Sequence, residues 1–331
     1  MREVAALAGV SVKTVSRVVN AEPGVSAPLV DRVTRAIAQL DYRHNLTASN
    51  LRRSDQRTGT LGLLVEDVAN PFFADIHRGV EDVAQVRRTA VMAASLDRDP
   101  EAERTLVSAF VSRRVDGLIL GPTSREQGYL ANEMRSGWPV VCVDRLPQGV
   151  DVDVVMTNNK EATEEGVAHL LEHGHRRIAF LSRDYRISTA QDRHAGYVAA
   201  MAAAGAAILP SWVRFDVADI EASEAEVRRL MALPEPPTAL FTAQNLLTIG
   251  AVTALRELRL SHKVALVGYD DFLLADLLDP AVTVVAQNPR QMGHVAARIV
   301  FDRMDDSTLK PGRHVIPSRL VVRGSGEIRP D

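Results

Sequence analysis

Several polar side chains stand at the carboxyl ends of short apolar segments. Asp144 ends the segment PVVCVD, Asp270 comes just after VALVG, and Gln244 and Gln287 occupy comparable positions. The carboxyl ends of parallel strands are the edge at which α/β sheets bind ligands. Carboxylates accept hydrogen bonds from vicinal hydroxyl groups, so these residues suit a polyhydroxylated ligand. The alternative is that each side chain caps its own strand or forms a salt bridge.

A second group of candidate residues is the histidine set His169, His173 and His175 in the segment HLLEHGH. The first two are four residues apart on one expected helix, which is a spacing typical of metal ligands. No acid or cysteine obviously completes a site, and histidine and glycine are also common where a helix ends. We therefore expect no metal site and no cofactor.

Catalytic motifs give no support for an enzyme. Cys142 is the one cysteine of the chain. It lies in an apolar segment, which favours a buried, inert thiol, and a lone cysteine fits a cytosolic protein. The sequence contains no G-x-G-x-x-G, Walker A or G-x-S-x-G pattern.

From Leu61 onward, short apolar segments alternate with amphipathic helical patterns. Strands are expected at residues 61–65, 90–95, 117–121, 139–143, 178–182, 238–242, 264–268 and 283–287. Helices are expected between most of them, including residues 72–86, 101–113, 160–173 and 246–258. Repeated β-α units predict parallel sheets covered by helices on both faces. Since so many strands exceed one comfortable sheet, we expect two α/β lobes with a ligand cleft between them.

The N-terminal residues have a different pattern, that of short helices. The segment REVAALA predicts a first helix with Val4 and Leu7 on one face. Gly9 supplies a turn, and Ser11 can cap a second helix over residues 12–20.

A third helix is expected from a cap at Ser26 to about Leu40. Helix, tight turn, helix and supporting helix form the helix-turn-helix arrangement. Residues 1–57 carry nine basic and five acidic side chains, although the whole chain has a net charge of -3. A basic head on an acidic body suits binding of a polyanion by one end of the molecule.

The sequence resembles the LacI/GalR family of bacterial transcription regulators over essentially its whole length. The head segment VAALAGVSVKTVSRVVN closely matches the DNA-reading segment of that family. The segments NPFFADIHRGVEDVA, VDGLIL, HLLEHGHRRIAFL, DRHAGY and VALVGYDD follow in the family's order. The resemblance implies an all-α helix-turn-helix head and a two-lobed α/β body like that of periplasmic sugar-binding proteins.

The resemblance also implies the domain boundaries. Residues 1–44 would form the DNA-binding domain and residues 45–60 a hinge helix and linker. Residues 61–331 would form the effector-binding and dimerisation domain. Its N-subdomain would comprise about 61–157 and 289–316, and its C-subdomain about 158–288 and 317–331.

The expected DNA contacts come from the second helix, which would enter the major groove by its N-terminal end. Val12, Lys13 and Arg17 would face base edges, and Thr14, Ser16 and Asn20 would contact phosphates. The alternative is a solvated polar helix face.

The segment of residues 45–53 resembles the family's hinge helix, which lies in the minor groove. Leu51 would wedge between base pairs, Ala48 would permit close approach, and Arg52 and Arg53 would supply positive charge to the phosphates. Asn45, at the start of the segment, is also expected to contact DNA. A disordered linker is the alternative, and both descriptions can hold, since such a segment can fold only on DNA.

In the body, the resemblance implies that Phe72 or Phe73 stacks on the ligand and that Arg193 reaches it. From the residues alone, packing in the core is the better interpretation of the two phenylalanines. Gln244-Asn245 replaces the family's usual Asn-Asp pair. The first helix begins almost at Met1, so we also expect the natural transcript to encode a few residues upstream.

Together these observations predict a homodimeric repressor that binds a near-palindromic operator in double-stranded DNA. A small effector, expected to be a sugar or sugar derivative, would bind between the lobes. A purine, nucleoside or phosphoprotein corepressor is the alternative within this class. A solute-binding transport protein and a sugar-active enzyme are the alternatives outside it. No apolar segment approaches the length of a membrane span, so a cytoplasmic, nucleoid-associated protein without a membrane partner is expected.

Overall fold

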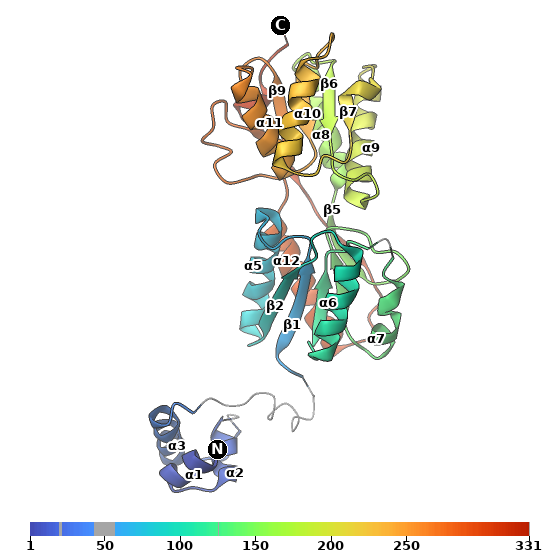
Figure 1. Ribbon diagram of the computed structural model, residues 1–331. Helices are drawn as coiled ribbons and strands as arrows, with labels where there is room; N and C mark the ends of the chain where they lie inside the picture. Colours follow the sequence, from blue (N-terminus) through green and yellow to red (C-terminus); the bar gives the residue numbers. More distant parts are fainter. Residues whose placement is uncertain (20–21, 43–56, 125, 331) are drawn as a thin grey trace. The chain divides into compact units, whose positions relative to one another are not determined.

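The computed structural model describes residues 1–19, 22–42, 57–124 and 126–330 (Figure 1). The chain forms two compact units, Met1–Thr58 and Gly59–Asp331. Five residues expected to contact DNA lie outside the described residues: Asn20, Asn45, Ala48, Leu51 and Arg52. Most of the expected hinge at 45–60 also lies outside them.

The head contains the three expected helices, α1 (Arg2–Ala8), α2 (Val12–Val19) and α3 (Ala27–Gln39). Gly9 ends α1 with a φ of 61°, a left-handed conformation that glycine adopts without strain. A small apolar core joins the helices and consists of Val4, Ala5, Ala8, Val15, Val33 and Ala36.

One detail of the predicted head is wrong. Leu7 is 47% exposed, whereas Val4 is fully buried together with Ala5 and Ala8. The buried residues of α1 are Val4, Ala5 and Ala8, and at 3.6 residues per turn Ala5 and Ala8 lie on one side of Val4 whereas Leu7 lies on the other. Leu40, at the end of α3, is also exposed.

The body begins with a first lobe built on a six-stranded parallel sheet. Its strands are β1 (Thr60–Val65), β2 (Ala90–Ser95), β3 (Gly117–Leu120), β4 (Val140–Val143), β5 (Asp153–Thr157) and β11 (Arg313–Ile316). They lie in the order β11-β5-β4-β3-β1-β2. The helices of this lobe are α5 (Pro71–Val86), α6 (Pro100–Ser112), α7 (Ala131–Arg135) and α12 (Pro289–Asp305).

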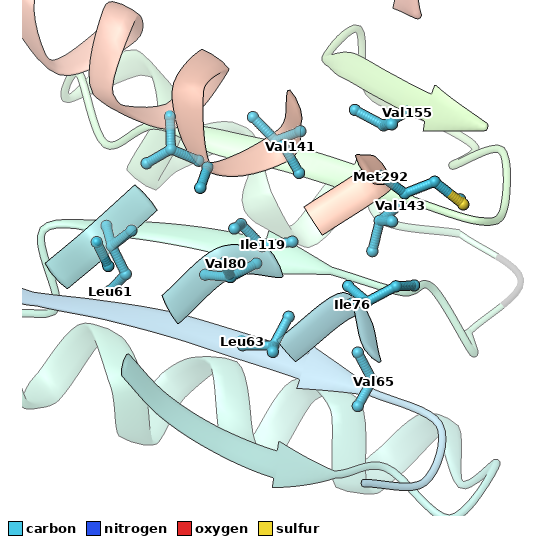
Figure 2. Close-up of a cluster of buried hydrophobic side chains, with 14 of the residues drawn as sticks. Leu61, Leu63, Val65, Ile76, Val80, Ile119, Val141, Val143, Val155 and Met292 are labelled. Atoms are coloured by element: carbon cyan, nitrogen blue, oxygen red, sulfur yellow. The ribbon is translucent and has the colours of Figure 1, made fainter. Parts of the chain in front are cut away.

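Helices cover both faces of this sheet, as the continuous apolar strands predict. Figure 2 shows Leu61, Leu63 and Val65 of β1 in one core cluster with Ile76 of α5 and Met292 of α12. Leu64 and Leu118 face the opposite side, where they share a core cluster with residues of α6.

Two glycines allow α5 and α12 to pack closely. A Cβ atom added at Gly79 would lie 2.1 Å from the carbonyl oxygen of Arg290. A Cβ atom added at Gly293 would lie 2.1 Å from the carbonyl oxygen of Ile76. Any larger residue at either position would push the helices apart.

A second lobe repeats this design. Its strands are β6 (Ile178–Leu181), β7 (Val213–Arg214), β8 (Ala239–Thr242), β9 (Ala265–Tyr269), β10 (Thr283–Ala286) and β12 (Arg319–Val321). They lie in the order β12-β10-β9-β8-β6-β7, and β12 is antiparallel to β10. The helices are α8 (Asn159–Glu172), α9 (Ser188–Ala203), α10 (Ile220–Met231) and α11 (Asn245–Glu257). Short 3-10 helices occur at Gly128–Leu130 in the first lobe and at Pro210–Trp212 and Gly324–Gly326 in the second lobe.

The chain crosses between the lobes three times. It enters the second sheet after β5, returns to the first through α12 after β10, and crosses again between β11 and β12. The expected two-lobed α/β body is therefore present. Within the described residues, none of the helices is long and apolar enough to cross a membrane.

Candidate ligand-binding site

A cavity with about 500 Å³ of empty space, open to solvent, lies where the carboxyl ends of the parallel strands of the two sheets meet. Its lining includes residues that directly follow six strands: Glu66, Asp144, Ser182, Ala243, Asp270 and Gln287. All seven residues expected to bind an effector line it: Phe72, Phe73, Asp144, Arg193, Gln244, Asp270 and Gln287.

Asp144 and Asp270 occupy equivalent positions in the two lobes. Asp144 follows β4 with a φ of 71°, and Asp270 follows β9 with a φ of 69°. Each backbone amide donates to the neighbouring strand at 2.9 Å, that of Asp144 to Val155 and that of Asp270 to Val285. Strained backbone at two equivalent buried acids is typical of a functional site.

Both carboxyl groups are held where ionisation is unfavourable. Burial raises the pKa of Asp144, although the positive charges of Arg145 and Arg193 partly oppose this. Burial likewise raises the pKa of Asp270, against the charge of Arg193 and a hydrogen bond from Gln287. A ligand that donates hydrogen bonds to these oxygens would compensate for the water they have lost.

Arg193 of α9, which lines the same cavity, is held by contacts within the second lobe. Its Nε donates to Asn159 Oδ1 at 2.7 Å, and its Nη1 donates to the carbonyl oxygen of Ala243 at 2.7 Å. Its guanidinium carbon lies 3.7 Å from the centre of the Tyr269 ring. Arg193 therefore has a single orientation before any ligand arrives, which lowers the entropy lost on binding.

The two glutamines supply acceptors. The Nε2 group of Gln287 donates to Asp270. The Oε1 atoms of Gln244 and Gln287 are buried and have no hydrogen-bond partner among the described residues. Because an unpaired buried acceptor is unfavourable, both oxygens are suited to receive hydroxyl groups of a ligand.

Phe72 and Phe73 stand in the first turn of α5, where the Asn70 side chain caps the helix by accepting from the Phe72 amide at 3.0 Å. Their ring centroids are 5.0 Å apart at an interplanar angle of 74°. Both rings line the cavity and also belong to the core of the first lobe. Packing in the core and contact with a ligand are thus compatible interpretations of these two phenylalanines.

The same cavity contains an ion-pair group that was not predicted from the sequence. Glu66 follows β1, and its Oε1 accepts from Arg183 Nη1 of the second lobe at 2.6 Å, while Arg145 pairs with its other oxygen. Burial alone would raise the pKa of Glu66, but the charges of Arg145 and Arg183 outweigh it and lower that pKa. The strand-end rule that identified Asp144 would also have identified Glu66.

Other polar contacts also join the lobes. Asn245 Nδ2 donates to Asn70 Oδ1 at 2.9 Å, and the Leu146 amide donates to Ser188 Oγ at 3.2 Å. We call the Asn70–Asn245 contact the interlobe clasp. Such contacts can be exchanged for water, so they permit the lobes to separate.

In the head, the first turn of α2 is accessible as expected. Val12 and Lys13 are exposed, and Ser11 Oγ accepts from the Thr14 amide at 3.1 Å, which caps the helix. Ser16 and Arg17 are half-buried. Arg17 donates to the carbonyl oxygen of Pro23, and its Nε lies 3.6 Å from a Glu22 carboxylate oxygen. Its guanidinium group therefore contacts the loop after α2.

A helix-turn-helix head followed by a two-lobed α/β body with a cavity between its sheets is the architecture of a DNA-binding transcription regulator. Residues 1–45 match the family model of bacterial regulatory proteins, lacI family, and residues 167–326 match that of a periplasmic binding protein-like domain. The chain is 30% identical to the ribose operon repressor of Escherichia coli (strain K12), over 98% of this chain and 99% of that protein. It therefore belongs to the LacI family.

Two solved structures support this assignment over nearly the full length of both chains. The complex of the transcriptional regulator CelR with cellobiose is 32% identical, covers 98% of each chain and has a TM-score of 0.72. The Lac repressor dimer bound to operator and the anti-inducer ONPF is 25% identical, with a TM-score of 0.84. That similarity covers 98% of this chain and 97% of the Lac repressor chain.

Proposed function

We propose that this chain is a homodimeric repressor whose affinity for operator DNA is set by a sugar or sugar derivative bound between the lobes. The observation that carries the proposal is the excess of hydrogen-bond acceptors in the cavity. Asp144 and Asp270 are buried carboxylates, and the free amide oxygens of Gln244 and Gln287 add to them. A ligand rich in hydroxyl donors satisfies such a lining, and cellobiose in the CelR complex is a ligand of that kind.

A nucleoside or phosphoprotein fits this lining less well. The ribose of a nucleoside also offers hydroxyl donors, but purine ring nitrogens and phosphate oxygens are mostly acceptors and need donors. Two of the cavity's guanidinium groups, those of Arg145 and Arg183, already pair with Glu66. The third, that of Arg193, uses two of its five N–H groups on Asn159 and Ala243, so it is the main donor left for a ligand.

The proposed DNA contacts begin in the head. Val12 and Lys13 would read base edges, and Thr14 and Ser16 would contact phosphates. Arg17 would join the base-reading group by exchanging Pro23 and Glu22 for DNA. The further contacts proposed for Asn20, Asn45, Ala48, Leu51 and Arg52 concern residues outside the described part of the chain.

The proposed mechanism couples these two sites. On this proposal residues 1–44 bind DNA, residues 45–60 connect, and residues 61–331 bind the effector and the second subunit. A ligand that contacts both lobes stabilises one angle between them over another. Any difference in DNA affinity between these two states then appears as ligand control of operator binding.

The experiment is a thermal-shift screen of the purified chain against neutral sugars and nucleosides, repeated with Asp270→Asn. A ligand that binds the native state raises the melting temperature by linkage. We expect at least one sugar to do so, and Asp270→Asn to weaken its binding by roughly 10- to 100-fold, the value of a hydrogen bond to a charged group. Stabilisation by nucleosides alone would favour the alternative effector class.

A further inference from the structure

Outside the cavity, the second lobe gathers two histidines and a glutamate that are distant in sequence. His169 lies in the last turn of α8, His173 caps the end of that helix, and Glu327 follows the 3-10 helix Gly324–Gly326. The Nε2 atom of His169 lies 3.4 Å from Glu327 Oε1, and the Nε2 atom of His173 lies 3.3 Å from the same oxygen. The chain thus supplies the acid that inspection of the sequence did not find.

These distances match the edges of a metal coordination sphere. A tetrahedral ion bound at about 2.0–2.1 Å to nitrogen and oxygen has ligand atoms about 3.3–3.4 Å apart. All three donor atoms lie within 4.8 Å of one another. The two imidazole rings are 4.4 Å apart between centroids, so both nitrogens can approach one ion.

The surroundings of the two histidines also fit metal ligands. The Nδ1 atom of His173 is 2.8 Å from the carbonyl oxygen of His169, so it carries the proton and leaves a lone pair on Nε2. The His169 side chain is only 10% exposed, and its Nε2 has no hydrogen-bond partner in the described part of the chain.

We propose that His169, His173 and Glu327 form a binding site for a divalent transition metal, with Zn²⁺ as the reference ion. Two imidazoles and one carboxylate favour zinc and its neighbours over Mg²⁺ or Ca²⁺, which prefer all-oxygen sites. Three protein ligands leave a fourth position for water.

The position in the fold indicates what the metal would do. Asn159, at the other end of α8, contacts Arg193 of the cavity. The helix has 14 residues, which places the metal site about 20 Å from that end. The metal site is therefore remote from the cavity, and it joins α8 to the C-terminal segment of residues 326–330. His175 Nε2 already lies 2.8 Å from the Ile328 carbonyl oxygen of this segment. A bound ion would therefore fasten this segment to the second lobe.

The test is calorimetric titration of the full chain with Zn²⁺ after chelation and dialysis, for the wild type, His173→Gln and Glu327→Gln. Glu327 is half-exposed, so its substitution leaves the fold intact. His77→Gln is the matched control, because His77 Nε2 lies 3.6 Å from Glu81 Oε1 on α5 but belongs to no group of three potential ligands among the described residues.

We expect one saturable Zn²⁺ site per chain in the wild type and in His77→Gln. His173→Gln and Glu327→Gln should each lower the Zn²⁺ affinity by more than the roughly 10- to 100-fold loss that follows when a residue that only hydrogen-bonds to a metal ligand is replaced. Zn²⁺ should also slow hydrogen exchange of residues 326–330 in the wild type and not in Glu327→Gln. The proposal is overturned if the wild type lacks a saturable site, or if His173→Gln and Glu327→Gln bind Zn²⁺ as the wild type does.

Discussion

Asp270 illustrates how a single residue can serve ligand binding at the expense of stability. Its backbone has a left-handed conformation and its carboxyl group is buried, and this burial raises the pKa of the carboxyl group. The folded state therefore holds the proton more tightly than the unfolded state, whose aspartate pKa is about 3.9. As pH rises from the unfolded pKa through the raised folded pKa, the unfolding free energy falls, and the loss is complete above the folded value.

Asp270→Asn should therefore stabilise the ligand-free protein near neutral pH, although it weakens sugar binding. The gain over wild type should shrink as the pH is lowered towards about 4, because the wild-type carboxyl then becomes neutral too. Urea unfolding at several pH values measures this difference.

Asp82→Asn provides a control of opposite sign. Hydrogen bonds from His294 and Arg290 lower the pKa of Asp82, so its substitution should destabilise the protein near neutral pH. If Asp270→Asn is instead less stable than wild type at neutral pH, the attraction between the Asp270 charge and Arg193 outweighs the cost of burying that charge.

Arg17 is the residue on which the DNA-reading hypothesis depends most. Arg17→Ala should weaken binding to the preferred duplex by roughly 1–3 kcal/mol and relax base preference at one position per half-site. Ser16→Ala should weaken preferred and random duplexes about equally, because a phosphate contact carries no sequence information. Selection from a randomised duplex library, followed by anisotropy titrations, measures both. Equal losses on both duplexes for Arg17→Ala would remove Arg17 from the base-reading set.

At the scale of elements, helix capping in the head offers a matched comparison. Ser11 caps α2 through a hydrogen bond with the Thr14 amide, whereas Ser26 stands at the start of α3 without a side-chain capping bond. Ser11→Ala should destabilise its helix by about 1 kcal/mol and speed amide exchange in α2 about five-fold. Ser26→Ala should change the exchange of α3 far less. Similar effects of the two substitutions would contradict this difference in capping.

The sequence predicted the elements whose signal is local. The strands β4 and β9 are short apolar segments, and Asp144 and Asp270, the acids that follow them, were found because a strand end is visible in sequence. By contrast, β5 begins at Asp153, a buried acid that pairs with Arg303 of α12. That partner is distant in sequence, so no local pattern marks β5 as a strand.

The same limit applied to the candidate sites. The interlobe clasp joins Asn70 to Asn245, and the histidine pair is completed by Glu327, residues that only the fold brings together. Leu7 shows the converse error, since helical spacing identifies a face but not whether a neighbour covers it.

At the scale of the whole body, the lobes are held by polar contacts that can open. Asn245→Ala removes the interlobe clasp and leaves the Asn70 cap of α5 in place. Loss of a hydrogen bond contributing about 0.5–1.5 kcal/mol should shift the balance of closed and open lobes roughly 2- to 10-fold towards open. Small-angle scattering of the ligand-free variant should therefore give a larger radius of gyration.

Thr253→Ala is the control on the same helix, because the Thr253 hydroxyl bonds only to Ile249 within α11 among the contacts of the described residues. If Asn245→Ala scatters as the wild type and Thr253→Ala do, the clasp contributes nothing to closure.

The proposed function requires that a sugar in the interlobe cavity controls DNA binding. The most direct measurement is the dissociation constant of the full chain for its selected duplex, with and without the sugar found by thermal shift, in wild type and Asp270→Asn. We expect the sugar to change the dissociation constant of the wild type by roughly 5- to 150-fold, the usual range of allosteric coupling, and that of the variant little at the same sugar concentration. A sugar that binds the cavity but leaves the wild-type dissociation constant unaltered would contradict the proposed function.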